Sequence, residues 1–257
     1  MRAKKRDISN TVTVYWSPGR FSLEEESWNM LYSEPTPVIN DVFENTYKDA
    51  EIRKCPGTRA ALKNVFTVKA NHKENIHFPE NYLERINNIS EKTFPLDIPS
   101  TLQIHKQRSS EYPNRVNLVY NMSWYFFASE PLEAKMTSPY YPPQTPTPGS
   151  AVFPGEFNIG LWYRPFNLEY SIPFNAKSFQ IKPNDDLFYL EFKTDKKIVF
   201  QRYNNSKSLD SLAAEFTTAP QMFGFGKTLA QRYDLAKRTK TADIVLGEIQ
   251  KNIVNPK

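Results

Sequence analysis

Alternating apolar and polar residues are the main pattern along this chain, and they predict β-strands. In "RVNLVYNMSWYFF" (115–127) every even position is apolar, whereas Asn117, Asn121 and Ser123 lie between them. A repeat of two residues is typical of a strand that buries one face. "TVTVYW" (11–16) and "VFTVKA" (65–70) predict further strands in the same way.

Two longer blocks predict more of the sheet structure. "NIGLWYRPFNLEYSI" (158–172) reads either as one strand interrupted or bulged at Pro165 or as two strands. "DLFYLEFKTDKKIVFQRY" (186–203) predicts a β-hairpin, with residues 194–197 as the turn between strands 187–193 and 198–203.

Helices are fewer and shorter. Thr58 is the expected N-cap of a helix over "RAALKN" (59–64), and Ser208 is the expected N-cap of "SLDSLAAEF" (208–216). Near the C-terminus, apolar residues recur at helical spacing, which predicts an amphipathic helix that docks on the body. These residues are Ala242, Val245, Leu246, Ile249 and Ile253.

A proline-rich segment, "SPYYPPQTPTPGSAVFPGEF" (138–157), interrupts the strands. It holds six prolines between Pro139 and Pro154, so it is not a central strand and predicts an extended loop, a lid or a linker. Tyr140 and Tyr141 lie at its base. Their rings either stack on a ligand or pack the loop onto the sheet.

These patterns together predict a mainly β, α+β protein of 257 residues, in which 14% aromatic residues and 20 prolines favour strands joined by stiff connections. We expect an antiparallel β-sandwich, jelly-roll-like or β-clip-like body with short peripheral helices. The predicted parts are a basic N-terminal tail (1–10), a β-rich body (11–219) with the proline-rich loop 138–156, and a C-terminal helical segment (220–257).

The net charge of +5 is concentrated at the two ends of the chain, and the body is not basic. The N-terminal residues Arg2, Lys4, Lys5 and Arg6 are either a solvated tail or a weak nucleic-acid contact. The chain has no run of eighteen apolar residues and no signal-peptide pattern, so we expect a soluble, cytoplasmic protein without membrane contact. A single cysteine excludes an internal disulfide.

Known catalytic motifs are missing. In "QMFGFGKT" (221–228), Gln221 stands where a P-loop requires glycine, so the chain is not predicted to be a P-loop NTPase; Gly224 and Gly226 predict a turn instead. His72, His77 and Glu80 match no recurrent metal spacing, and we expect no metal and no cofactor. Cys55 is expected to be buried and inert.

One short run combines aromatic rings with a guanidinium group. Trp162, Tyr163 and Arg164 are candidates, with Tyr140 and Tyr141, for holding an anionic, sugar-like or nucleotide-like ligand in a pocket between the sheet and the proline-rich loop. The alternative is that Arg164 pairs with a carboxylate and the aromatic residues belong to the core.

Two resemblances extend this picture. "FQIKPNDDLFYLEF" (179–192) resembles the turn and strand of the β-clip fold of dUTPase and dCTP deaminase, with Asn184 in the left-handed position of a glycine; other segments of that family are missing, so the resemblance implies topology and not nucleotide chemistry. A wider set of segments resembles an uncharacterised protein family of tailed marine bacteriophages and some bacteria: "VYWSPG", "WNMLYSEP", "KCPGTRAALKNVFTVKA", "GLWYRPFNLEY" and "IKPNDDLFYLEF". That resemblance implies no activity.

The leading hypothesis is therefore a non-enzymatic, β-rich binding or structural protein. If it is phage-encoded, it acts with a protein partner in the host cytoplasm or the virion. The alternatives are a small-molecule binding protein or enzyme with a pocket under the proline-rich loop, and nucleic-acid association through the basic ends.

Overall fold

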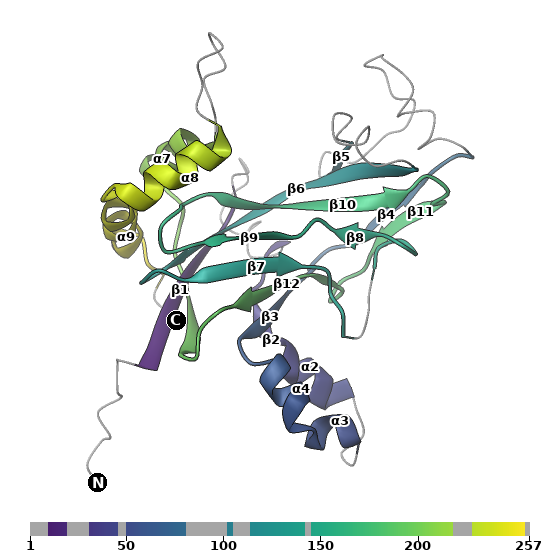
Figure 1. The fold of residues 1–257 in the computed structure, drawn as a ribbon. Helices are drawn as coiled ribbons and strands as arrows, with labels where there is room; N and C mark the ends of the chain where they lie inside the picture. Colours follow the sequence, from purple (N-terminus) through teal and green to yellow (C-terminus); the bar gives the residue numbers. More distant parts are fainter. Residues whose placement is uncertain are drawn as a thin grey trace.

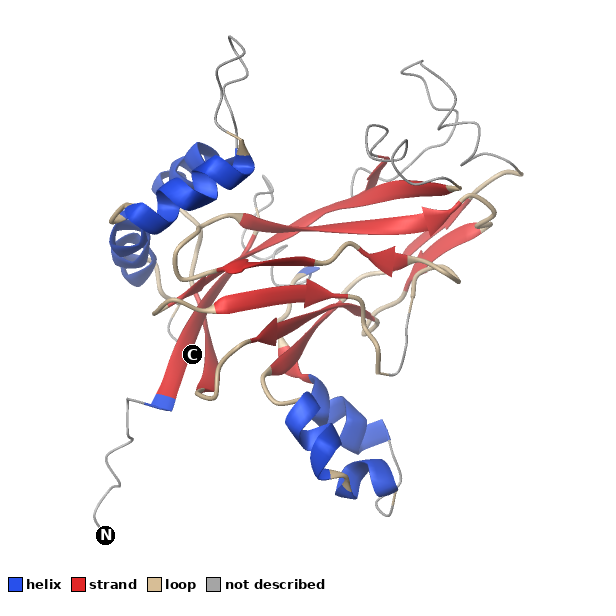
Figure 2. Cartoon of the chain, viewed as in Figure 1, coloured by secondary structure: helices blue, strands red, loops and turns tan. Residues whose placement is uncertain are grey.

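The computed structural model describes residues 10–19, 31–45, 50–80, 102–104, 114–141, 145–217 and 228–254. In these ranges the chain forms two large open sheets and a smaller pair of strands, with short helices outside them (Figures 1 and 2). Neither large sheet closes on itself among the described strands. The predicted mainly β, sandwich-like fold is confirmed.

The six-stranded sheet has the order β13, β1, β6, β10, β8, and β5 also pairs with β6. Its pairs are antiparallel except β1 with β13, which is parallel. The strands are β1 (Thr11–Pro18), β5 (Leu102–Ile104), β6 (Arg115–Ala128), β8 (Ala151–Val152), β10 (Pro165–Pro173) and β13 (Lys197–Arg202).

The five-stranded sheet has the order β2, β3, β12, β7, β9, with antiparallel pairs throughout. A separate pair joins β4 to β11. These strands are β2 (Thr36–Pro37), β3 (Val65–Lys69), β4 (Glu74–His77), β7 (Glu133–Thr137), β9 (Gly155–Asn158), β11 (Ser178–Ile181) and β12 (Asp186–Phe192).

The main core lies between the two large sheets. The even positions of β6 are all buried there, as the alternation predicts. Trp124 is fully buried, and its ring meets Tyr32 and Phe188 edge-on, each at 5.2 Å between centroids. Such aromatic pairs add stability beyond the burial of their surface.

Helices cover the outer faces of both sheets (Figure 1). Val245 and Ile249 of the predicted C-terminal stripe pack under the six-stranded sheet against Tyr125 and Phe127, which confirms the amphipathic helix. The helices on this side are α7 (Lys207–Thr217), α8 (Leu229–Arg238) and α9 (Thr241–Lys251), and those on the other side are α2 (Val38–Asn45), α3 (Glu51–Lys54) and α4 (Pro56–Ala61). No helix in the described ranges combines the length and apolarity needed to cross a membrane.

The half-buried reading of β6 is wrong at both ends of the strand. Tyr125, Phe127 and Asn117 lie on the face predicted to be polar and open, and all three are buried. Helices α7 and α9 cover the first two, because their own apolar stripes need a surface on which to pack.

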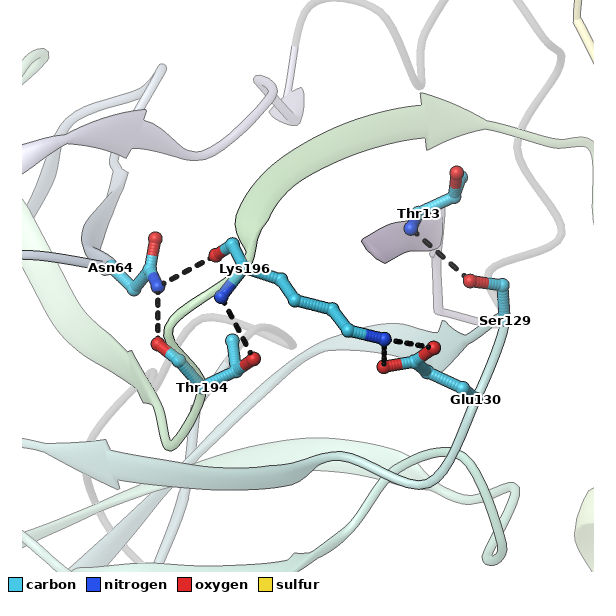
Figure 3. A network of polar contacts seen from close by, with 6 residues as sticks. All are labelled: Thr13, Asn64, Ser129, Glu130, Thr194 and Lys196. Atoms are coloured by element: carbon cyan, nitrogen blue, oxygen red, sulfur yellow. Dashed lines mark hydrogen bonds and ion pairs between the residues drawn. The ribbon is translucent and has the colours of Figure 1, made fainter. Parts of the chain in front are cut away.

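The predicted hairpin over 186–203 is also wrong, although both strands exist. β12 belongs to the five-stranded sheet and β13 to the six-stranded sheet, so the turn between them carries the chain across the sandwich. Asn64 holds this turn, since its side-chain amide donates to the carbonyls of Thr194 at 2.7 Å and Lys196 at 3.0 Å (Figure 3). The Lys196 ammonium group in turn lies 2.8 Å from both carboxylate oxygens of Glu130.

Other boundaries differ by a few residues. The block 158–172 forms one strand, β10, which begins at Pro165 after a turn over 159–164, and its irregular register lies between Asn167 and Leu168 instead of at Pro165. Thr58 lies inside α4, because Pro56 favours the first helical position. Ser208 lies inside α7, where the Ser206 hydroxyl accepts from Leu209 N at 3.2 Å.

The turn of the β-clip-like segment is as predicted. Asn184 has a φ of 70°, in the left-handed region, between Pro183 and the start of β12. The Asp185 amide donates to the Lys182 carbonyl at 3.0 Å, which closes a turn with proline and asparagine at its centre.

The proline-rich segment links the edges of both sheets. It leaves β7, adds β8 beside β10, and returns to the five-stranded sheet as β9 beside β7. Both strands are short and lie at sheet ends, which confirms that this segment is not a central strand.

Candidate functional site

A groove of about 330 Å³ opens where the end of the proline-rich segment meets the start of β10. Pro154 and Asn167 are exposed in its wall, whereas Phe166 is buried. Further wall residues are Glu156, Phe157, Trp162, Arg164 and Glu169. A concave surface that mixes aromatic and polar groups in this way is typical of a ligand site.

Arg164 is the basic residue in the wall of the groove. Its guanidinium carbon lies 4.8 Å from the ring centroid of Trp162 and 5.6 Å from that of Phe157. The Nε group donates to the Pro165 carbonyl at 3.4 Å. Stacking on aromatic rings leaves a guanidinium charged and fixes its plane, which suits it to hold a planar anion.

The turn that carries Trp162 and Arg164 is anchored from two sides. The Asn158 side-chain oxygen accepts from Leu132 N at 3.0 Å and from Gly160 N at 3.1 Å. Asn158 N donates to the hydroxyl of Tyr233 on α8 at 2.9 Å, and the Tyr233 ring lies 4.9 Å from Trp162. The groove is therefore formed before any ligand enters, which lowers the entropic cost of binding.

Of the predicted site residues, the structure brings together Trp162 and Arg164. Tyr163 points into the core beneath α7 and α9, where its ring stacks on Tyr125 at 5.0 Å and its hydroxyl lies 2.9 Å from that of Tyr203. Burial raises the pKa of Tyr163 well above its ordinary value. Neighbouring side chains in this turn point to different sides, so the three-residue run does not act as one unit.

Tyr140 and Tyr141 lie apart from the groove. The Tyr140 ring meets Tyr189 edge-on at 5.0 Å, and the Tyr189 hydroxyl donates to the Tyr141 carbonyl. Tyr141 packs against the apolar cluster that α2 forms with the five-stranded sheet, which includes Val38, Val42 and Tyr189. These contacts fit the alternative in which the two tyrosines pack the loop onto the sheet, although Tyr140 remains 45% exposed.

Sequence reasoning missed a polar network between α2 and the five-stranded sheet. The Asp186 carboxylate accepts from Thr67 Oγ1 at 2.8 Å, and Lys69 Nζ lies 3.8 Å from Asp186 and 2.9 Å from Asp41. Burial raises the pKa of Asp186, which the Thr67 hydroxyl and Lys69 oppose. A polar cavity of about 450 Å³ adjoins Asp186 and is also lined by Pro146, Gln180 and Lys182. Asp185 and Asp186, which follow the turn at Pro183 and Asn184, are the one feature of the sequence that points to this cluster.

The histidines considered as metal ligands do not converge. His72 faces inward, where its Nε2 contacts the Tyr120 hydroxyl and lies 3.5 Å from a Glu74 oxygen. Burial lowers the pKa of His72, and Glu74 acts in the opposite direction. His77 and Glu80 are exposed. Within the described ranges, no three His, Cys, Asp or Glu side chains gather in a possible metal-ligand group.

Cys55 is exposed, so the prediction of a buried thiol is wrong, whereas the predicted inertness stays a prediction. It occupies the N-cap of α4, where the backbone N–H of Thr58, the Thr58 hydroxyl and the Gly57 N–H lower its pKa. Helix N-termini favour the thiolate in this way because their N–H groups are unpaired.

We expect Cys55 to react with iodoacetamide with a pH midpoint below that of a cysteine in an unstructured peptide. Thr58→Val removes one donor and raises the midpoint, whereas Thr58→Ser keeps the hydroxyl and leaves it close to that of the parent protein. Alkylation rates measured between pH 6 and pH 10 decide the matter. Equal midpoints for the protein and the peptide would contradict the assignment.

The basic residues Arg2, Lys4, Lys5 and Arg6 lie outside the described residues, as do Gln221, Gly224 and Gly226. Thr228 is described, and it begins α8 in a capping box with Gln231. Nucleic-acid association through the N-terminal residues stays a prediction.

The fold and the groove define a class of protein, namely a mainly β sandwich with helices on both outer faces and a preformed groove at a sheet edge. No family model, curated protein or solved structure matches the chain. The resemblance to phage-encoded proteins stays a prediction.

Proposed function

We propose that this is a non-enzymatic binding protein and that the groove at Trp162 and Arg164 holds its ligand. One observation carries the proposal: a guanidinium group lies over two aromatic rings in the wall of a preformed groove. A phage origin would place this role in the infected cell or in the virion, with a protein partner.

The composition of the wall supports binding over covalent catalysis. The described residues that line the groove include no serine, threonine, cysteine, lysine or histidine. The groups there that could carry a proton or act as a nucleophile are the carboxylates of Glu156 and Glu169, and Glu156 pairs with the Lys193 ammonium group. They offer Arg164 for an anionic group, Phe157 and Pro154 for a flat apolar face, and Asn167 for hydrogen bonds. A ligand with these features is sugar-like or nucleotide-like and carries a negative charge.

A thermal-shift screen with nucleoside monophosphates, sugar phosphates and uncharged sugars tests this proposal. A compound present at a hundred times its dissociation constant stabilises the protein by about 2.7 kcal/mol. This raises the melting temperature by roughly 5–10 °C for a chain of this size, at about 2–4 °C for each kcal/mol. A short oligonucleotide in the same screen tests the nucleic-acid alternative, whose affinity falls steeply as salt rises.

Arg164→Lys keeps the charge and loses the planar fork, so we expect at least a tenfold loss of affinity with less than about 1 kcal/mol lost from the free energy of unfolding. Arg59→Lys is the matched control, because the Arg59 guanidinium stacks in the same way on Phe43 at 4.7 Å, away from the groove. Calorimetric titration measures both variants. Equal affinities for the two variants would place the ligand elsewhere. A screen in which no anionic compound raises the melting temperature would refute the groove as an anion site.

A further inference from the structure

The outer edge of β13 is longer and more regular than the other outer edges of the two large sheets. β2 and β8 have two residues each, and β9 has four and directly follows Pro154. β13 has six residues, no proline and an uninterrupted register with β1. Val199, near its middle, is 41% exposed. A regular, apolar edge of this kind is a template for another strand.

The chain itself shows which strand direction this edge accepts. Ile253 forms an antiparallel bridge with Tyr203, Val254 N donates to the Arg202 carbonyl at 3.0 Å, and Asn204 N donates to the Asn252 carbonyl at 2.9 Å. Residues 202 and 204 thus direct their backbone groups away from β1.

Backbone direction alternates along a strand, so Ile198 and Phe200 direct their N–H and C=O groups to the same outer side. No described residue pairs with them there. Residues 252–254 therefore cover one end of the edge, and within the described part of the chain no backbone group pairs with the outer side of residues 197–201.

These five residues are self-complementary about Val199. In an antiparallel pair of two copies with the two-fold axis at Val199, Ile198 of each copy lies opposite Phe200 of the other, and the two residues exchange both backbone hydrogen bonds. Lys197 lies opposite Gln201, so no like charges meet. The two Val199 side chains face each other on the axis, where each covers the exposed surface of the other.

We propose that β13 joins the same strand of a second copy, so that the protein forms a two-fold dimer with one sheet continuous across both molecules. A C2 interface uses the same patch on both subunits, as this edge requires. The pairing is short and places the interface in the small class, so we expect a dissociation constant on the order of micromolar. This inference is independent of the ligand groove.

Sedimentation velocity from 1 to 200 µM tests the dimer. We expect a concentration-dependent shift from monomer to dimer, and at least a tenfold weaker association for Val199→Lys, which sets two positive charges against each other on the axis. Leu229→Lys is the control, because Leu229 is exposed to a similar extent, 47%, and lies on α8. It should associate like the parent protein. A monomer at every concentration, or a dimer that Val199→Lys leaves unchanged, would overturn the proposal.

A cross-link reports the register directly. Residues in a non-hydrogen-bonded antiparallel pair have Cα atoms about 4.5 Å apart, which lies at the short end of the range that a disulfide spans. In a Cys55→Ser background, which removes the exposed native thiol, Val199→Cys should form a covalent dimer under mild oxidation. Leu229→Cys in the same background should form it much more slowly. Equal rates for the two variants would exclude the axis at Val199.

Discussion

Replacing Gly160 with alanine is expected to lower the free energy of unfolding by about 3 kcal/mol or more, the upper end of the range for overpacked sites. A Cβ atom at this position would lie 2.0 Å from the carbonyl oxygen of Glu130, 2.6 Å from its carbonyl carbon and 2.9 Å from Pro131 Cα. All three are backbone atoms, so no side-chain rotation relieves the contact. The turn after β6 must move, and it carries the Glu130 carboxylate that pairs with Lys196.

Gly155→Ala is the matched control, because a Cβ atom there meets nothing within 4 Å and the residue also lines the groove. Its free energy of unfolding should stay within about 0.5 kcal/mol of the parent protein. Urea denaturation followed by tryptophan fluorescence measures both variants. Similar losses for the two alanine variants would mean that the Gly160 turn tolerates displacement. If Gly160→Ala alone is destabilised, we expect it also to bind the ligand more weakly, because Gly160 lies two residues before Trp162.

The sequence predicted most strands because alternation reports which residues face a core. It predicted Thr11–Pro18, Val65–Lys69 and Arg115–Ala128 nearly to their ends. The same pattern says nothing about what covers the second face of a sheet. The burial of Tyr125 and Phe127 depends on helices more than eighty residues away in sequence, and so it was not predicted.

Pairing partners were the least predictable feature for a similar reason. Two strands separated by a four-residue turn favour a hairpin. Here β12 finds better partners in β3 and β7, and its run of buried residues suits a strand in the middle of a sheet. This choice depends on distant strands, and no local pattern records it.

The candidate site was predictable in part. The run at residues 162–164 and the nearby prolines suggested a pocket under the proline-rich loop, and Trp162 and Arg164 do line a groove there. Tyr233, which packs against Trp162 from α8, gave no signal, because one tyrosine in a helix of mixed polar and apolar residues forms no pattern of its own. The run also predicted that Tyr163 lines the pocket with Trp162 and Arg164. Its side chain instead points to the other side of the turn, into the core beneath α7 and α9.

The inter-sheet turn gives the second large prediction. Asn64 has a φ of 56°, a conformation that costs a residue such as alanine about 1 kcal/mol. Its amide also makes two hydrogen bonds to the turn, each contributing about 1 kcal/mol. We therefore expect Asn64→Ala to lower the free energy of unfolding by about 3 kcal/mol in total.

Two controls separate the contributions to the Asn64 effect. Asn64→Gly tolerates the positive φ and loses the hydrogen bonds alone, so it should be about 1 kcal/mol more stable than Asn64→Ala. Lys63→Ala breaks the exposed ion pair with Asp195 in the same turn and should change stability by less than about 1 kcal/mol. Urea denaturation of the three variants ranks them. If Asn64→Ala loses no more free energy of unfolding than Lys63→Ala, the Asn64 amide does not hold the turn. The strands on either side of the turn must then fix the crossing between the sheets.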